Sequence, residues 1–383
     1  MLRTFRNLAV NIIAAFIRDK HERHKFRNKY KIKSKFRKLR DDNKILFNDN
    51  ALLKQELGVI KKELELIRQK YFFRYSPNVV ANCKNFYSQA MSGNLKDKYQ
   101  NLISGLDSKS IECVSQLISR IKIISEKNAD SVGAIDIFTE GEKVQLDTVR
   151  KEFYQQVIAL SDECWAYRQY LLPTNRVGPS ALYYKHQIPY LKDIKKLYGK
   201  DFMDVGCYIG NSALVFTEYT NGKIFTFEPT SINYELTLKT IEMNRCKNII
   251  PVKLALGSRD EELEIKIYGG ASTLNKAMPA YGMSDQTERI TVTSLDNFVR
   301  GKDIDVGLIK VDIEGFEQEF LKGAEQTIRK HKPAMILSIY HNASDFFSIK
   351  PIIESWDLGY NFQIMHPIDG GLWGETVLIC EIY

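Results

Sequence analysis

Two acidic residues and two glycines, set at the ends of two predicted strands, could bind a nucleoside. The first strand runs into Asp204 and is followed by Gly206 and Gly210, and the second, at 223–228, ends on Glu228. In an open α/β sheet, glycines let the backbone approach a ligand, and an acid ending the second strand accepts hydrogen bonds from both ribose hydroxyls. This spacing therefore predicts a nucleoside-binding loop.

The interior of this loop argues against a dinucleotide. A GxGxxG loop would carry a further glycine where this chain has Cys207, Tyr208 and Ile209. Without it, a pyrophosphate cannot easily rest on the N-terminus of the following helix. The common nucleoside ligand that lacks a pyrophosphate is S-adenosylmethionine.

A second group of charged residues lies in the segment KVDIEGFE. Lys310, Asp312 and Glu314 alternate with apolar residues, so on a strand they would share one face. Because buried, unpaired charges are costly, we expect this segment to reach the carboxyl edge of the sheet, where open α/β folds bind ligands. The alternative is a salt bridge from Lys310 to a carboxylate that fixes the end of the strand.

Alternating strand and helix signals beyond residue 179 indicate the elements that would position these residues. The pattern predicts a doubly wound, mostly parallel, seven-stranded sheet. The last two strands follow each other across a short turn, so one of them should be antiparallel, which is the layout of class I methyltransferases. We expect strands near 201–206, 223–228, 249–254, 305–311, 334–340, 360–366 and 375–382, and helices near 211–219, 231–244, 316–330 and 346–357.

The part from about 180 to 383 resembles the FkbM family of S-adenosylmethionine-dependent methyltransferases. A further segment, YYKHQIPYL at 183–191, resembles a bacterial subgroup of the surface-glycan type. The segments that carry the family resemblance are DVGCYIGNS at 204–212, FEP at 227–229, NIIPVKLALGS at 248–258, LIKVDIEGFEQEFLKGAE at 308–325, SIYHNASDFFSIKP at 338–351 and ETVLICE at 375–381.

The resemblance implies a site for S-adenosylmethionine at the carboxyl edge of the sheet. Asp204 would orient the loop or the amino group of the methionine, and Glu228 would bind the ribose hydroxyls. Asn211 would cap the following helix, although capping is also the ordinary alternative role for Asp204 and Glu228. The other expected cofactor-binding residues are Gly206, Gly210, Leu254 and Ala255.

The resemblance also implies methyl transfer to an oxygen, which must lose its proton as it attacks. His341 or Asp312 could accept this proton, and Lys310 and Glu314 would position the acceptor. The expected substrate-side residues are Tyr184, His186, Ser272, His366 and Glu375. Ser272 belongs to an insert between strands that could form a lid or a plain turn excursion.

We expect no metal site. His341, His366, Asp312 and Glu314 are suitable ligand types, but their positions lack the compact spacing of a metal motif. The six cysteines contain no CxxC pair, so they indicate reduced thiols in a cytosolic protein rather than a disulfide framework or a zinc site.

The net charge of +8 comes from the first 44 residues, which carry 15 Lys and Arg against 4 Asp and Glu. Residues 2–17 have an apolar helical face, and a basic run follows them. We expect this arm to lie on the inner face of the cytoplasmic membrane as a peripheral contact. A helix packed on the protein's own body is the alternative. The apolar start argues against nucleic acid, the third possibility.

Residues 45–75 have apolar residues at heptad spacing, with a polar Asn50 in the seam. They predict a coiled coil that joins copies of the chain, although one helix packed on its own domain is the alternative. We read 76–178 as a helical region, with a helical face that continues through Val157, Leu160 and Cys164. The methyltransferase-like domain then spans 179–383.

The sequence therefore predicts a cytoplasmic enzyme that methylates a hydroxyl of a bacterial cell-surface glycan or glycolipid intermediate. One alternative is an enzyme of glycan assembly that uses a nucleotide sugar. The other is a non-catalytic coiled-coil assembly protein with a remnant methyltransferase fold. The complete set of Asp204, Gly206, Gly210 and Glu228 argues against the remnant.

Overall fold

The computed structural model describes residues 55–62, 72–268, 271–273 and 287–383. The predicted arm at 1–44 lies outside these residues, and so does most of the predicted coiled coil, of which residues 55–62 are helical. The chain divides into two units, one with the residues up to Tyr75 and Val132–Leu146, the other with Ser76–Ser131 and Asp147–Tyr383. In the first, β1 (Phe73–Tyr75) pairs with β2 (Gly133–Ile135).

A seven-stranded sheet forms the centre of the second unit, in the order β15-β16-β14-β13-β6-β7-β8. Only β16 runs against its neighbours, since it pairs antiparallel with both β14 and β15. This confirms the predicted mostly parallel sheet with an antiparallel last strand. The strands are β6 (Asp201–Val205), β7 (Ile224–Phe227), β8 (Ile249–Val252), β13 (Val306–Val311), β14 (Ala334–Ser338), β15 (Asn361–Met365) and β16 (Val377–Glu381).

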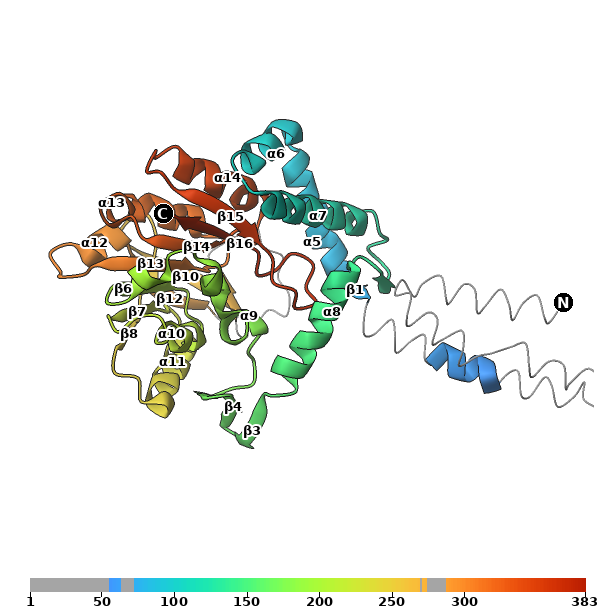
Figure 1. The fold of residues 1–383 in the computed structure, drawn as a ribbon, viewed down its shortest axis with the longest axis horizontal. Helices are drawn as coiled ribbons and strands as arrows, with labels where there is room; N and C mark the ends of the chain where they lie inside the picture. The colour runs from blue at the N-terminus through green and yellow to red at the C-terminus, as the bar shows by residue number, and fades with distance from the viewer. Residues whose placement is uncertain (1–54, 63–71, 269–270, 274–286) are drawn as a thin grey trace, which may run out of the picture. The chain divides into compact units, whose positions relative to one another are not determined.

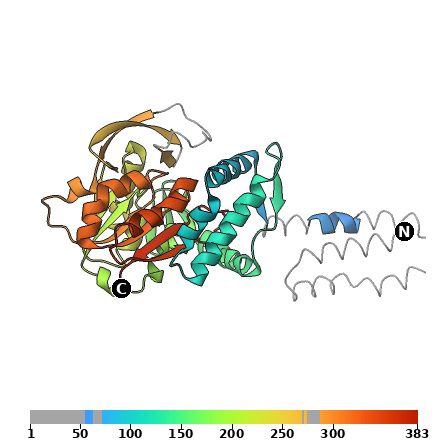
Figure 2. The ribbon, with the colours of Figure 1, turned by 90° about the horizontal axis from the view of Figure 1, so that it is seen from above.

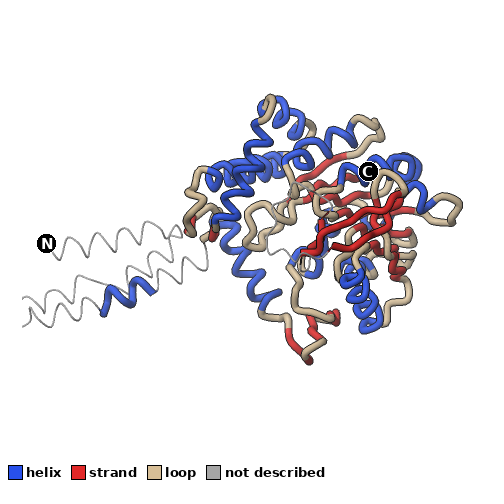
Figure 3. The backbone as a smooth tube through the Cα atoms, turned by 180° about the vertical axis from the view of Figure 1, so that it is seen from behind, coloured by secondary structure: helices blue, strands red, loops and turns tan. Residues whose placement is uncertain are grey.

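Helices cover both faces of this sheet (Figure 1). α13 (Glu317–His331) and α14 (Ala343–Glu354) lie on one side, and α10 (Asn211–Phe216) and α11 (Ser231–Asn244) lie on the other. Because both faces are covered, every residue of β7, β13, β14 and β16 is buried. Figure 3 shows the strands in red with the helices in blue around them.

A second sheet follows β8 and has four strands in the order β11-β10-β12-β9. Its small apolar core contains Ala255, Ile265, Ile290 and Val292. The curved strands coloured gold to orange in Figure 2 belong to it. The insert at 269–290, for which a lid and a plain turn excursion were both open, falls largely outside the described residues. The strands are β9 (Ala255–Leu256), β10 (Glu261–Tyr268), β11 (Ala271–Thr273) and β12 (Thr287–Thr293), and a short helix α12 (Leu295–Val299) comes next.

The region ahead of the methyltransferase-like part is helical up to Tyr154 except for the short strands β1 and β2. α7 begins as predicted, because the Asp107 side chain accepts a hydrogen bond from Ser110 N at 2.7 Å. Thr139 and Glu142 form the expected capping box with two reciprocal hydrogen bonds. The helices are α5 (Pro77–Met91), α6 (Leu95–Ile103), α7 (Ser108–Ser125), α8 (Glu140–Val149) and a π-helical turn (Arg150–Tyr154). In the described part of the chain, no helix combines the length and apolar character needed to cross a membrane.

The predicted helical face through Val157, Leu160 and Cys164 is wrong. These residues lie in or beside a three-stranded antiparallel sheet of β3 (Ile158–Ser161), β4 (Cys164–Tyr167) and β5 (Tyr170–Leu172). The backbone of Leu171 exchanges two hydrogen bonds with the side chain of Asn244 on α11. A partner this distant in sequence cannot be read from local periodicity. The four-segment division of the chain stays a prediction.

Gly206 brings the ends of β6 and β13 together. Its φ is +77°, and a Cβ at this position would lie 1.9 Å from the backbone oxygen of Asp312. The Asp312 amide in turn donates to the carbonyl of Val205 at 3.0 Å. The glycine is therefore required by the protein's own backbone, independently of any ligand.

We predict that Gly206→Ala destabilises the protein far more than Gly93→Ala. Gly93 also has a positive φ, +84°, but nothing lies within 4 Å of its absent Cβ. Strain in the left-handed region alone should cost about 1–2 kcal/mol, whereas the clash at 206 forces two strand ends apart. Urea unfolding of the two variants measures the difference. Equal losses in the free energy of unfolding would contradict the close approach.

Candidate active site

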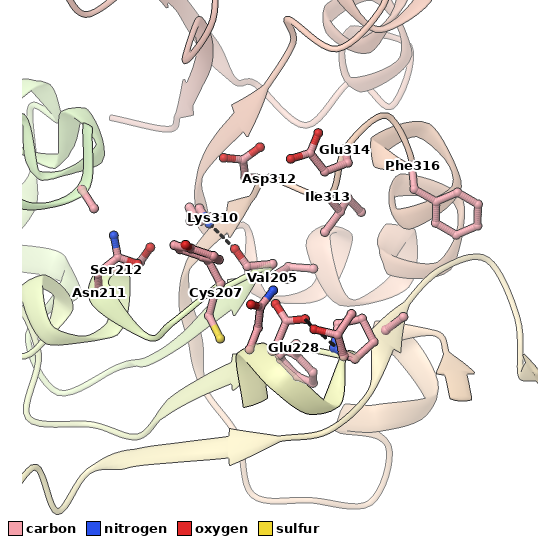
Figure 4. A pocket seen from close by; sticks show the side chains of 18 of the residues that line it. Val205, Cys207, Asn211, Ser212, Glu228, Lys310, Asp312, Ile313, Glu314 and Phe316 are labelled. Atoms are coloured by element: carbon pink, nitrogen blue, oxygen red, sulfur yellow. Dashed lines mark hydrogen bonds between the residues drawn. The ribbon is translucent and has the colours of Figure 1, made fainter. Parts of the chain in front are cut away.

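A cavity of about 320 Å³ opens at the carboxyl edge of the seven-stranded sheet. The loops after β6, β7, β13 and β14 line it, together with residues of the second sheet and of the segment 176–186. In Figure 4, Glu228 lies toward one end, Asp312 and Glu314 lie toward the other, and Lys310 is placed between them. This is the edge at which open α/β sheets bind ligands.

Glu228 is the acid at the first end of the cavity. Its Oε1 accepts hydrogen bonds from the amide of Thr230 at 3.0 Å and from the Thr230 hydroxyl at 2.6 Å. Burial raises the pKa of Glu228 to about 7, against the opposing effect of these hydrogen bonds. The predicted cofactor residues Leu254 and Ala255 line the same cavity.

The loop after β6 differs in detail from the prediction. Gly210, with φ +79°, is itself the N-cap of α10, and no side chain caps this helix. Asn211 therefore does not cap the helix as expected. It is the first helical residue, and it lines the cavity, whereas Gly210 does not.

Asp204 is fully buried and does not line the cavity. Thr226 Oγ1 donates to its Oδ2 at 3.2 Å, and Lys310 Nζ lies 3.4 Å from its Oδ1. Burial raises the pKa of Asp204, and Lys310 and Thr226 oppose that shift. The chain thus contains the salt bridge considered for Lys310. Because Lys310 Nζ also donates to the Gly206 carbonyl at 2.7 Å, Asp204 acts on the loop through Lys310.

The other end of the cavity is acidic. Asp312 and Glu314 follow β13, and Glu375 precedes β16. Tyr340 donates from its hydroxyl to Asp312 Oδ1 at 3.1 Å. Burial raises the pKa of Glu314, and burial with the nearby charge of Asp312 raises the pKa of Glu375 to about 7. Hydroxyl groups of a ligand would find several acceptors here.

His341 lies behind this acidic end and does not line the cavity. Its side chain is 1% exposed, with Nδ1 3.0 Å from Glu317 Oε1 and Nε2 3.4 Å from both Asp312 Oδ1 and Glu314 Oε2. Burial opposes a charge on the ring, but the three carboxylates outweigh it and raise the pKa of His341 to about 10. In this arrangement His341 carries a proton at neutral pH, which argues against its predicted role as proton acceptor.

The predicted substrate-side residues are dispersed. His186 and Glu375 line the cavity, and Tyr184 and His366 do not. Tyr184 instead donates to the carbonyl of Ile368 at 2.8 Å, and His366 Nδ1 lies 3.2 Å from Thr376 Oγ1. Ser272 is a residue of β11 whose side chain is outside the described part.

His186 contacts the start of α10 and belongs to a segment whose backbone is strained. Lys185, His186 and Gln187 have φ values of 52°, 49° and 63°, which L-residues rarely adopt in succession. The ring Nε2 of His186 lies 2.8 Å from Ser212 Oγ. Burial, followed by the charge of Lys310, holds the pKa of His186 well below its usual range, so this histidine is neutral.

Several lining residues were not predicted from the sequence. Tyr340 directly precedes His341, and Phe316 lies inside the KVDIEGFE segment, so the same motifs could have indicated both. Arg176, Asp369 and Asn233 also line the cavity. They come from a linker, a turn and a helix with no local signal of function.

A family model and a solved structure agree with the fold that carries this site. Residues 204–363 match the model of the methyltransferase FkbM domain. The crystal structure of an FkbM methyltransferase from Methylobacillus flagellatus KT has a similar fold, with a TM-score of 0.50 and 18% identity over 77% of this chain and 60% of that one. An rRNA methylase from Streptococcus thermophilus has a TM-score of 0.32 and 10% identity over 52% of this chain and 94% of its own. No curated protein matches the sequence.

The match to the M. flagellatus protein thus spans less than two thirds of that protein's length. The family-model match begins at Asp204 and includes Gly206, Glu228, Lys310, Asp312, Glu314 and His341. Residues 204–363 of this chain are a methyltransferase FkbM domain, and the cofactor of that domain is S-adenosylmethionine.

Proposed function

We propose that this protein methylates a hydroxyl oxygen of a bacterial cell-surface glycan or glycolipid intermediate, with S-adenosylmethionine as the methyl donor. The observation that carries the proposal is one cavity with a buried acid after the second strand, Glu228, at one end and Asp312 and Glu314 at the other. A third carboxylate, Glu375, lines the same cavity and is close enough to Asp312 for their charges to interact. Such a cavity can hold a nucleoside and a polyhydroxylated acceptor side by side.

The residues present fit the donor. Thr230 fixes the carboxylate of Glu228 where a second-strand acid accepts ribose hydroxyls, and Leu254 and Ala255 offer an apolar border for an adenine ring. When bound, S-adenosylmethionine supplies a methyl carbon that is open to attack by an oxygen. The chain's own contribution is to bind, to orient and to remove a proton.

The charge of the cavity supports a neutral, hydroxyl-rich acceptor. Among the described residues that line it, Arg176 and Lys310 are the permanent cations, and Lys310 is already paired with Asp204. Asp312, Glu314 and Glu375 would repel a diphosphate and would accept hydrogen bonds from sugar hydroxyls. This balance disfavours the nucleotide-sugar alternative.

Glu375 is the proton acceptor in this proposal, with Asp312 orienting the hydroxyl. The pKa of Glu375 is raised to about 7, and a base works best when its pKa lies near the working pH. The donor would supply the methyl group and its sulfur would keep the electron pair of the broken carbon–sulfur bond, while the Glu375 carboxylate would take the proton from the acceptor hydroxyl.

The proposal also places the enzyme at the inner membrane face. The membrane location is inferred from the basic arm at 1–44, which has an apolar helical face. The heptad spacing of apolar residues at 45–75 supports self-association of the chain. Both would keep the domain close to membrane-bound glycan intermediates.

We predict that Glu228→Gln weakens binding of S-adenosylmethionine about 10- to 100-fold, since hydrogen bonds to a charged acceptor contribute about 1.5–3 kcal/mol. The wild-type affinity should rise as pH increases through about 7, because the raised pKa keeps Glu228 protonated below that pH and only the carboxylate accepts both hydroxyls. In Glu228→Gln this pH dependence should disappear.

Calorimetric titration at several pH values measures both effects. Glu242→Gln is the matched control, because Glu242 is an exposed carboxylate on α11, the helix that follows Glu228. Wild-type protein that binds no S-adenosylmethionine, or Glu228→Gln with unchanged affinity, would refute the donor site.

We predict that Glu375→Gln lowers kcat about 10²- to 10⁴-fold and leaves donor affinity nearly unchanged. In the wild type, turnover should increase with pH through about 7 as Glu375 loses its proton, and the variant should lack this step. The assay follows S-adenosylhomocysteine formed with a panel of neutral methyl glycosides. If the variant retains full turnover and the same pH profile, Glu375 is not the base.

For the arm, we expect the full chain to co-sediment with vesicles that contain phosphatidylglycerol and to remain in solution with neutral phosphatidylcholine vesicles, because about 1 kcal/mol per cation is gained at an anionic surface. Deleting residues 1–44 should abolish sedimentation and preserve donor binding. A truncated protein that still pellets would show that another part of the chain contacts the membrane.

A further inference from the structure

The acidic end of the cavity continues inward to a buried cluster that methyl transfer alone does not explain. Asp312 follows β13, Glu317 begins α13, and His341 follows β14. Glu314 and Asp345 lie next to them and act electrostatically on the same histidine or on Glu317. Four carboxylates thus surround one imidazole.

The spacing of three members suits a metal ion. One ligand atom each from Asp312, Glu317 and His341 lies within 4.8 Å of the other two. Cations of the Mg²⁺ type have ligand bonds of about 2.0–2.1 Å, so opposite ligands are about 4 Å apart and adjacent ones about 3 Å. Small side-chain movements would bring these three atoms to bonding distance from a single ion.

A second, independent observation comes from hydrogen bonding. The side chains of His341 and Glu317 are each 1% exposed. Nδ1 of His341 pairs with Glu317 Oε1 at 3.0 Å. Among the described residues, the other ring nitrogen, Nε2, has no hydrogen-bond partner, and it lies 3.4 Å from Asp312 Oδ1 and Glu314 Oε2. Oε1 of Glu317 also accepts from the amide of Ile313 at 2.9 Å, which holds that side chain in place. A buried polar atom without a hydrogen-bond partner indicates a missing ligand.

The charges favour a cation over any other occupant. Glu314 and Asp312 line the cavity, and Lys310, a buried amine whose charge acts on Glu314, is already engaged by Asp204 and the Gly206 carbonyl. A divalent cation would balance the remaining carboxylates and would displace the proton from His341. Carboxylate oxygens with one imidazole suit Mn²⁺ and related cations.

We propose that Asp312, Glu317 and His341 form a divalent-cation site at the inner end of the cavity. Asp312 is 21% exposed and connects this site to the cavity, so open coordination positions would face an acceptor hydroxyl there. Bound to the cation, that hydroxyl would lose its proton more readily, and Glu375 would take it. Only this last role rests on the proposed function; cation binding does not.

The sequence did not predict this site. Its ligands stand at positions 312, 317 and 341, a spacing that matches no compact metal motif. They come together because β13 and β14 are adjacent parallel strands, so the segments that follow them meet at one edge of the sheet.

The test is a titration of the full chain with Mn²⁺, followed by the electron paramagnetic resonance signal of the free ion. We expect one Mn²⁺ bound per chain, with competition by Mg²⁺. Asp312→Asn and His341→Gln should each weaken binding at least tenfold. Glu319→Gln is the matched control, since Glu319 is a carboxylate on the same helix that pairs with Lys322, and it should bind as the wild type does.

Thermal unfolding with and without Mn²⁺ shows whether each variant folds. A folded variant with no Mn²⁺-dependent rise in Tm supports the site, because a ligand bound only to the native state raises Tm. Asp312→Asn keeps the side-chain volume at a partly exposed position, so it tests the site even if His341→Gln does not fold.

The proposal is overturned if the wild type leaves the free Mn²⁺ signal unchanged, in which case the cluster is an ion pair with a protonated His341 only. It is equally overturned if Asp312→Asn binds Mn²⁺ as Glu319→Gln does. Binding of S-adenosylmethionine, measured on the same samples, separates the two proposals: loss of donor binding with intact Mn²⁺ binding refutes the function and leaves the cation site.

Discussion

The buried pair of Lys310 and Asp204 holds the two halves of the site together. Both side chains are almost entirely buried, Lys310 on β13 and Asp204 on the adjacent β6. A buried charge is tolerated only when it is paired and hydrogen-bonded. Here the ammonium group faces the Asp204 carboxylate at 3.4 Å and donates to the Gly206 carbonyl at 2.7 Å. The loop after β6 is thereby fixed to the neighbouring strand.

Two buried histidines near this pair carry different charges. The charge of Lys310 helps to keep His186 neutral, whereas carboxylates keep His341 protonated. Two buried histidines therefore differ in charge because of their neighbours and not because of burial, which acts on both in the same direction.

The sheet was predictable from sequence because its strands are short apolar runs bounded by turns, and the alternation of strand and helix fixes the layout. Gly206, Glu228, Asp312 and Glu314 could be placed at the cavity because each follows a strand at its carboxyl end. Tyr184 and His366 were misplaced, since the loops that carry them take their conformation from distant partners, Ile368 and Thr376. The three-stranded sheet at 158–172 was missed for the same reason.

Side-chain direction also separates what the sequence can predict from what it cannot. Tyr340 and His341 are adjacent, yet the first lines the cavity and the second lies behind it, against Glu317. The motif SIYH identifies the position along the chain but not which of the two side chains meets a ligand. A histidine suggests a base by its type, whereas its carboxylate neighbours, which come from other elements, determine its charge.

Backbone strain at the cavity explains how these groups are held. His186, Tyr208, Glu314 and Glu375 all line it, and all four have φ between 49° and 62°. Such conformations cost about 1–3 kcal/mol each and persist only where the surroundings impose them. Relaxation of Glu314 or Glu375 to an ordinary φ would turn its carboxylate away from the acceptor end. The strain is therefore the local cost of keeping the acidic groups in place before any acceptor arrives, and the rigid sheet beneath them supplies the stability that offsets it.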